Sequence, residues 1–142
     1  MRYWAWKHGS DPGGIPPDVK LYVLFHDPQR QQRLPHSIGM QKGLFGIVNA
    51  FADRSMMGSN DTVIAHELLH TLGAIDKYDL STTLPMFPVG YAEPERQPRY
   101  PQRFAELMGG RIPVTSERAE IPESLRQVMV GPYTAAEIGW TD

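Results

Sequence analysis

The hydrophobic pattern of the first third of the chain predicts two strands. Residues 19–25 (VKLYVLF) are rich in β-branched and aromatic side chains and nearly continuous in apolarity, which is typical of a strand buried on both faces. Residues 43–52 (GLFGIVNAFA) predict a second strand, and their two glycines indicate a bulge or the close approach of another backbone. The polar residues 29–41 between them predict a loop with a helical turn.

From about residue 60, the spacing of apolar residues changes from that of a strand to that of a helix. The apolar positions recur at four-residue spacing and form one stripe of a helix: Ile64, Leu68 and Leu72. Asn60 or Asp61 is suited to cap the start of this helix, because short polar side chains accept hydrogen bonds from its first N–H groups. Gly73 follows the last periodic residue, where helices commonly end.

The rest of the chain is poorer in periodic apolarity. Residues 77–101 are dense in proline and glycine, and a loop of that length in a compact domain indicates a functional rim. Residues 102–108 (QRFAELM) predict a short helix or strand, and residues 122–130 (PESLRQVMV) have a helical pattern. Residues 134–137 (TAAE) are a capping-box signature that opens a last helical turn. This order of elements predicts an α/β (α+β) fold with a small mixed sheet packed on the central helix.

Composition narrows the class of protein. The 142 residues predict one domain, 1–142, and contain no cysteine, which excludes disulfides, thiolate zinc sites and cysteine nucleophiles. A formal net charge of −2 with mixed signs gives no basic surface for nucleic acid. No stretch is long and apolar enough to cross a membrane, and residues 1–14 lack the apolar core of a signal peptide. The sequence leaves open the compartment, the oligomeric state and whether a further N-terminal segment exists.

Tyr3, Trp4 and Trp6 form an aromatic cluster ahead of a Gly/Pro-rich run. Aromatic side chains grouped in this way more often pack against a core or a sheet edge than bind a ligand. We therefore expect them to have a packing role.

The central helix carries the pattern H-E-x-x-H at residues 66–70. Residues four apart on a helix lie about 40° apart around its axis, so the imidazoles of His66 and His70 reach one point. Glu67 flanks that point, where a carboxylate can take a proton from a zinc-bound water whose pKa has fallen to about 7. The pattern predicts one Zn²⁺ ion on the two histidines, with Glu67 as general base.

Beyond the helix the string continues as H-E-x-x-H-x-x-G-x-x-D, ending at Asp76. It resembles the signature of the metzincin clan of zinc metallopeptidases, which is H-E-x-x-H-x-x-G-x-x-H followed by a methionine turn. Most members have histidine at the last position, but the snapalysin type is similar in using aspartate there. Carboxylate oxygen is an acceptable zinc ligand, and Gly73 permits a left-handed turn that returns residue 76 to the metal. The resemblance therefore implies Asp76 as the third metal ligand.

The same resemblance suggests roles for two other segments. Met108, in the sequence Leu-Met-Gly, looks like the methionine turn, whose thioether packs beneath the metal site. Residues 43–52 look like the edge strand that pairs with an extended substrate. A competing reading, on the gluzincin pattern, makes Glu106 the third ligand. We favour Asp76, because its short connection to His70 costs less loop-closure entropy.

Several other polar side chains are open candidates. Asp79 and Glu93 are further rival carboxylates for the metal. A phenol near the metal can donate a hydrogen bond to a developing oxyanion, and three tyrosines of the long loop qualify: Tyr78, Tyr91 and Tyr100. We expect an ordinary structural environment for His26, at a strand end, and His36 has no assigned role.

Taken together, the sequence predicts a zinc-dependent peptidase that acts on a peptide or protein. The alternative is a metal-stabilised binding module, or a protease relative that has lost its activity. Glu67 favours catalysis, because a structural metal site needs ligands and has no use for a free carboxylate at that place. A third alternative is that the motif is accidental and no metal binds. The cleavage preference and the existence of a pro-segment are left open.

Overall fold

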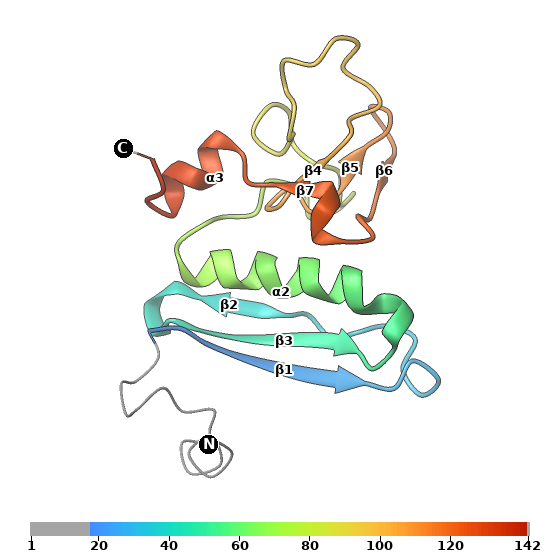
Figure 1. Cartoon of the computed structure of the whole chain (residues 1–142), viewed down its shortest axis with the longest axis vertical. Coiled ribbons are helices and arrows are strands. Elements are labelled where there is room, and N and C mark those ends of the chain that lie inside the picture. Colours follow the sequence, from blue (N-terminus) through green and yellow to red (C-terminus); the bar gives the residue numbers. More distant parts are fainter. Residues whose placement is uncertain (1–17, 142) are drawn as a thin grey trace.

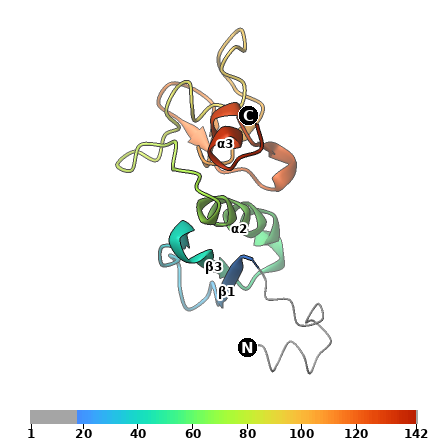
Figure 2. The same ribbon diagram turned by 90° about the vertical axis from the view of Figure 1, so that its left-hand side faces the viewer.

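One long helix separates a small β-sheet from a C-terminal half that is built mainly of loops. The computed structural model describes residues 18–141, so the prediction for Tyr3, Trp4 and Trp6 lies outside the described residues. Helix α2 (Met57–Thr71) lies between a three-stranded sheet and the C-terminal half of the chain (Figure 1). Figure 2, turned by 90°, shows the same order of layers with α2 seen nearly end-on. The predicted mixed α+β fold, with a small sheet packed on one main helix, is confirmed.

The sheet has the strand order β1-β3-β2. Strand β1 (Lys20–His26) runs parallel to β3 (Phe45–Phe51), and β2 (Ile38–Met40) pairs antiparallel with the other side of β3. Both predicted strands are therefore present, with ends displaced by one or two residues. The sequence pattern does not reveal β2, because a three-residue strand within a polar segment carries too little periodicity.

Two expectations about these strands are wrong. Strand β1 is not buried on both faces, since Leu24 is 49% exposed and Phe25 is 57% exposed. It lies at one edge of the sheet, and α2 covers only one sheet face. Residues 43–52 do not form an edge strand either, because β3 is the central strand and β2 takes the edge. The place of a strand in a sheet depends on its pairing partners, which its own sequence does not specify.

Helix α2 begins earlier than its sequence indicated, and neither Asn60 nor Asp61 caps it. The side chain of Asp53 accepts the N–H of Ser55 at 2.8 Å and starts a 3-10 turn, Arg54–Met56, from which α2 continues. Asn60 is 4% exposed and bonds both backbone groups of Phe51, accepting its N–H at 3.1 Å and donating to its carbonyl at 2.8 Å. Asn60 therefore joins the end of β3 to the first turns of α2.

The C-terminal half is built from short elements joined by long loops. In chain order these are β4 (Ala105–Glu106), β5 (Ile112–Pro113), β6 (Ala119–Glu120), a 3-10 turn (Leu125–Gln127), β7 (Val128–Met129) and α3 (Pro132–Glu137). Strand β4 pairs in parallel with β7, and β5 pairs antiparallel with β6. The prediction of a short helix or strand at residues 102–108 is met by β4.

The two C-terminal helix predictions need correction. Residues 122–130 form no α-helix, because their backbone is drawn into the pairing of β7 with β4 after a single 3-10 turn. Helix α3 exists but starts at Pro132, with Gly131 at its N-cap, as the fixed backbone of proline at a first helical position favours. Thr134 lies inside this helix, and its hydroxyl donates to Glu106 at 2.6 Å instead of capping.

A hydrophobic core joins α2 to the C-terminal half. Its buried members are Leu69, Ala74, Leu107 and Met108. On the other side of the helix, the sheet contributes the buried side chains Val48 and Ala50 of β3. Because α2 is packed from both sides, its rotation about its own axis is fixed, and so is the direction in which its polar side chains point.

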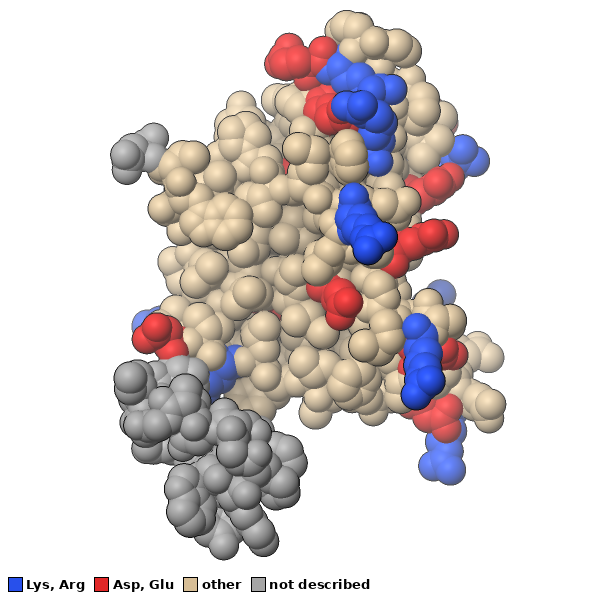
Figure 3. Space-filling view, in the orientation of Figure 1, with Lys and Arg blue, Asp and Glu red and all other residues tan. Residues whose placement is uncertain are grey.

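The surface has no dominant charge on the face drawn in Figure 3, where acidic and basic side chains are interspersed along one side. Among residues 18–141, none of the helices combines the length and the apolarity needed to span a membrane.

The double hydrogen bond of Asn60 gives a test of the layer contact. We expect Asn60→Ala to lower the free energy of unfolding by about 1–3 kcal/mol, because both buried backbone groups of Phe51 lose their partner. Asp61→Ala, at the exposed neighbouring position, is the control and should change stability by no more than about 0.5 kcal/mol. Urea denaturation followed by circular dichroism measures both, and equal stability of the two variants would contradict the role given to Asn60.

Candidate metal centre

Three side chains bring their polar atoms to one point beside α2. His66 Nε2 lies 3.1 Å from His70 Nε2, and Asp76 Oδ1 lies 3.0 Å from the first and 3.2 Å from the second. In a tetrahedral zinc site with bonds of about 2.0–2.1 Å, neighbouring ligand atoms are roughly 3.3 Å apart. The three atoms thus outline one face of such a site. In the described part of the chain, these residues are the one group of three or more His, Asp or Glu side chains close enough to share an ion.

Each imidazole is oriented through its other nitrogen. His66 Nδ1 lies 2.9 Å from the carbonyl oxygen of Leu107, and His70 Nδ1 lies 2.8 Å from that of Ala74. Because a carbonyl oxygen only accepts, each Nδ1 donates, and each ring turns its Nε2 atom toward the shared point. Two nitrogens and a carboxylate oxygen this close together need a positive charge between them, which a shared proton or a metal ion supplies. The donor set therefore fits a metal ion.

The end of α2 delivers both Asp76 and one of the orienting carbonyls. Gly73 has a φ of +108°, and its N–H donates to the carbonyl of His70 at 3.2 Å. The N–H of Ala74 reaches back to Leu69 at 3.0 Å, which completes a Schellman motif. The left-handed turn expected at Gly73 is confirmed. It points the carbonyl of Ala74 at the ring of His70 and returns the chain so that Asp76 meets the histidines.

The pKa shifts of Asp76 and His70 favour a positive charge between these side chains and His66. Burial acts to raise the pKa of Asp76, but hydrogen bonds and charge from His66 and His70 outweigh burial and hold that pKa well below its ordinary range. The hydrogen bond with Asp76 in turn raises the pKa of His70. Asp76 therefore stays ionised as an acceptor, and the cluster is stabilised by a cation at the point that its three atoms share.

Glu67 lies next to this point without joining it. The residue is 7% exposed, and its Oε2 atom is buried with no hydrogen-bond partner among the described residues. Burial raises the pKa of Glu67, against the lowering effect of the neighbouring imidazoles His66 and His70. An unpaired buried carboxylate oxygen is costly, so its presence indicates a site kept for water or for a substrate group.

A cleft of about 750 Å³ contains all four of these side chains in its lining. This volume lies within the range of ligand-binding clefts, roughly 300–1,000 Å³. One wall includes residues 34–39, which end in β2, and another includes Leu80 and Ile121, which are 79% and 59% exposed. The cleft therefore offers apolar contacts beside a polar, ionised centre.

Strand β2 approaches α2 most closely at Gly39. A Cβ atom on this residue would lie 2.3 Å from the carbonyl oxygen of Glu67 and 2.6 Å from Cβ of His70. No side chain fits in that space, so glycine is what allows the edge strand to lie directly against the motif. Sequence reasoning missed this residue, and the glycine within an otherwise polar segment was the one available signal.

The structure separates Asp76 from the rival carboxylate Glu106. Glu106 is fully buried: its Oε1 accepts the N–H of Gly131 and the hydroxyl of Thr134, and its Oε2 accepts the N–H of Gly109. These hydrogen bonds commit Glu106 to joining the turn after β4 to α3. It does not lie with His66 and His70, whereas Asp76 does.

The other rival carboxylates also have local roles. Asp79 accepts hydrogen bonds from the backbone and hydroxyl groups of Ser81 and Thr82, and these hydrogen bonds lower its pKa to about 2. Glu93 forms an ion pair with Arg103. Neither residue lines the cleft.

Of the three candidate tyrosines, Tyr78 lies at the site. Its ring centroid is 6.3 Å from that of His66, and burial followed by the negative charge of Asp76 raises the pKa of its hydroxyl. The hydroxyl therefore stays protonated and able to donate. Tyr91 and Tyr100 do not line the cleft, and their hydroxyl groups bond each other at 2.8 Å.

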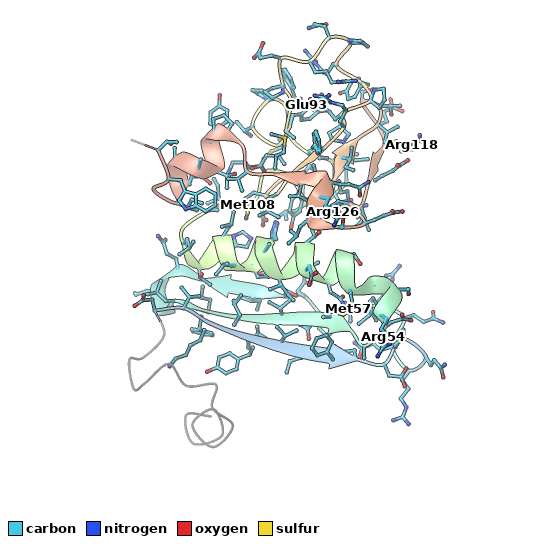
Figure 4. All side chains as sticks on the ribbon, viewed as in Figure 1. Arg54, Met57, Glu93, Met108, Arg118 and Arg126 are labelled. Atoms are coloured by element: carbon cyan, nitrogen blue, oxygen red, sulfur yellow. The ribbon has the colours of Figure 1, made fainter. Side chains whose placement is uncertain are left out.

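The structure also locates the three remaining candidate residues, His26, His36 and Met108. His26 Nε2 bonds Oδ1 of Asn49 at 2.8 Å, in the structural environment expected for it. His36 lines the cleft, with its carbonyl accepting the amide of Asn49 at 3.0 Å. Met108 is fully buried between α2 and the C-terminal half, as Figure 4 shows, and packs in one cluster with Leu69 and Ala74 beside the second histidine.

Comparisons of the chain with protein-family models, with curated proteins and with solved structures give no match. The interpretation of the site therefore depends on its own geometry and chemistry.

The choice between Asp76 and Glu106 can be tested by zinc affinity. Asp76→Asn should weaken zinc binding by more than about 100-fold, since loss of a mere supporting group already costs 10–100-fold. Glu106→Gln should lower the free energy of unfolding by about 1–3 kcal/mol through its buried hydrogen bonds and leave zinc affinity within about tenfold. Competition with a chromophoric chelator measures both, and the reverse ranking of affinities would make Glu106 the ligand.

Gly39 provides a test of the close contact between β2 and α2. Gly39→Ala should lower the free energy of unfolding by about 1–3 kcal/mol, because the added methyl group meets the backbone of Glu67. Gly139→Ala has open space around its Cβ but a left-handed backbone, so it is a control for strain without a clash. Thermal unfolding of both variants, with zinc added and without, is the measurement. A Gly39→Ala protein with wild-type stability and zinc affinity would contradict this packing.

Proposed function

We propose that this chain is a zinc-dependent peptidase that cleaves peptide bonds in a peptide or protein substrate, with Glu67 as general base. One observation carries the proposal: two imidazole nitrogens and a carboxylate oxygen face one another in a cleft, beside a buried oxygen of Glu67 that has no partner within residues 18–141. Metal ligands alone are compatible with a structural site. The free oxygen of Glu67 is the feature that favours catalysis.

The ligand set proposed for zinc is His66, His70 and Asp76. Two imidazole nitrogens with one carboxylate oxygen are a donor set typical of catalytic zinc, and no fourth residue joins their group within residues 18–141. Zinc bound there would supply Lewis acidity, which polarises a peptide carbonyl and makes a water molecule more acidic.

Glu67 moves the proton in this proposal. Its carboxylate takes a proton from the attacking water and then delivers it to the nitrogen of the leaving amine. A pKa raised by burial suits this role, because the group must accept the proton and later release it. Tyr78, protonated and lining the cleft, is placed to donate a hydrogen bond to the carbonyl oxygen as negative charge develops on it.

The substrate is proposed to bind in extended form along β2. This strand is an edge of the sheet and contributes residues to the cleft wall, so a peptide can add to it through main-chain hydrogen bonds. The role that the sequence suggested for residues 43–52 thus passes to β2. Contact of Gly39 with α2 keeps this edge next to Glu67.

The proposal includes the resemblance to the metzincin clan. It is supported by the left-handed turn at Gly73, by the return of Asp76 to the histidines and by the burial of Met108 in one cluster with Leu69 and Ala74. In this interpretation Met108 supplies the apolar floor of the site, as an unbranched and polarizable side chain can.

Three measurements on the purified protein test the function. Metal analysis without added zinc should find about one zinc per chain, and a chelator should abolish cleavage of a fluorogenic peptide mixture. Glu67→Gln should lower kcat/KM by about 10²–10⁴-fold, because proton transfer is lost, with zinc affinity little changed. Glu117→Gln, an exposed carboxylate, is the matched control.

The outcomes separate the proposal from its alternatives. Zinc binding without hydrolysis of any peptide would indicate a metal-stabilised binding module or an inactive relative. Absence of zinc binding would indicate that the motif is accidental. Full activity of Glu67→Gln would remove the proposed base.

A further inference from the structure

An ion pair between a buried lysine and a partly exposed glutamate lies next to the proposed third ligand. Lys77 is 2% exposed, and its Nζ atom lies 2.6 Å from Oε2 of Glu137, the last residue of α3. Lysine is almost never buried to this degree without a partner. The pair joins segments that are 60 residues apart in the chain.

Both members of the pair bond the residue between them and the histidines. Glu137 Oε2 accepts the N–H of Ile75 at 3.1 Å, and Lys77 Nζ donates to the carbonyl of Ile75 at 3.2 Å. Ile75 immediately precedes Asp76, so its peptide groups set the direction from which Asp76 enters the cluster. On the other side, the N–H of Lys77 donates to the carbonyl of Met108 at 2.9 Å. Asp76 is therefore held by hydrogen bonds to both flanking residues.

Side-chain packing does not explain the position of this segment. The side chain of Ile75 is largely in solvent, with the residue 63% exposed. Within the described residues, the backbone N–H of Ile75 has Glu137 as its recorded partner, and the backbone carbonyl has Lys77. The placement of Asp76 thus depends on polar contacts that the ion pair supplies.

Stability alone is a weak reason to bury Lys77. Removing its charge from water costs much of what its attraction to Glu137 returns, since the Glu137 side chain stays 27% exposed to solvent, and replacement of a buried charge by apolar atoms is often neutral or stabilising. What an apolar pair lacks is the ability to accept the N–H and to donate to the carbonyl of Ile75. The distinctive contribution of Lys77 and Glu137 is therefore to orient the backbone of Ile75, and with it the side chain of Asp76.

We infer that Lys77 and Glu137 are positioning residues that hold the Asp76 carboxylate at the point where His66 and His70 meet. This inference rests on the proposed zinc site, since it assigns to the pair an effect on metal affinity. It also gives α3 a role in the site, although no residue of that helix lines the cleft.

The test compares zinc affinity with the stability of the metal-free protein in three variants. Glu137→Gln keeps the size of the side chain and removes its charge. Lys77→Met combined with Glu137→Leu removes both charges and fills the space with apolar atoms. Glu93→Gln, which breaks the ion pair with Arg103 outside the cleft, is the matched control. Chelator competition measures zinc affinity, and thermal unfolding by circular dichroism measures stability without metal.

We expect zinc affinity to fall by about 10–100-fold in Glu137→Gln and in the double variant, as for other groups that orient metal ligands. The double variant should unfold at the wild-type temperature or above it when metal-free, because it no longer buries the charge of Lys77. Affinity lost while stability is kept is the signature of positioning. Glu93→Gln should bind zinc as tightly as the wild type.

The other possible results contradict either the positioning role of the ion pair or the proposed zinc site. A double variant that binds zinc like the wild type overturns the positioning role. If Glu137→Gln does not fold without metal, the double variant decides the question. If neither folds, the pair serves stability and the inference is overturned. A wild-type protein that binds no zinc refutes the proposed function itself, which this design distinguishes from failure of the inference.

Discussion

The convergence of three polar side-chain atoms on one point is the constraint on which this structure depends. Two imidazole nitrogens and one carboxylate oxygen lie within 3.2 Å of one another, so something outside the cluster must keep each of them there. The anchors are backbone carbonyls for the two rings, at Leu107 and Ala74, and the ion pair of Lys77 with Glu137 next to Asp76. None of these anchors belongs to the helix that carries the histidines.

Because the anchors of the cluster lie outside α2, both sides of the helix contribute to the site. The sheet beneath it brings the edge strand β2 against the motif through Gly39, and so forms one wall of the cleft. The C-terminal half above it supplies the carbonyl that orients His66 and, through α3, the contacts that hold the segment leading to Asp76. Glu106 belongs to the same arrangement, because its three hydrogen bonds fix the turn that contains Leu107. A buried carboxylate that the sequence offers as a rival ligand thus supports the segment that orients His66.

The electrostatics of the site follow from the same packing. Asp76 is kept ionised by the histidines, while Glu67 is shielded from water and its pKa rises. The pKa values of two carboxylates nine residues apart in the chain are therefore shifted in opposite directions by their environments. An acceptor fixed in its charged form and a neighbour able to exchange a proton are what metal-assisted hydrolysis needs from a protein.

The sequence by itself determined the parts of the site that depend on local geometry. Two histidines four residues apart share a helix face in any α-helix, and the turn at Gly73 needs only a residue that tolerates a left-handed backbone. Three features were decided by the tertiary structure: whether residues 43–52 lie at the edge or the centre of a sheet, which tyrosine lines the cleft, and whether residues 122–130 form a helix or a strand. Each of these depends on contacts between segments distant in the chain, and hydrophobic periodicity within one segment does not specify its partner. The helix motif was therefore legible in the sequence, while the carbonyls and the ion pair that hold it in a working geometry emerged only from the packing of the whole chain.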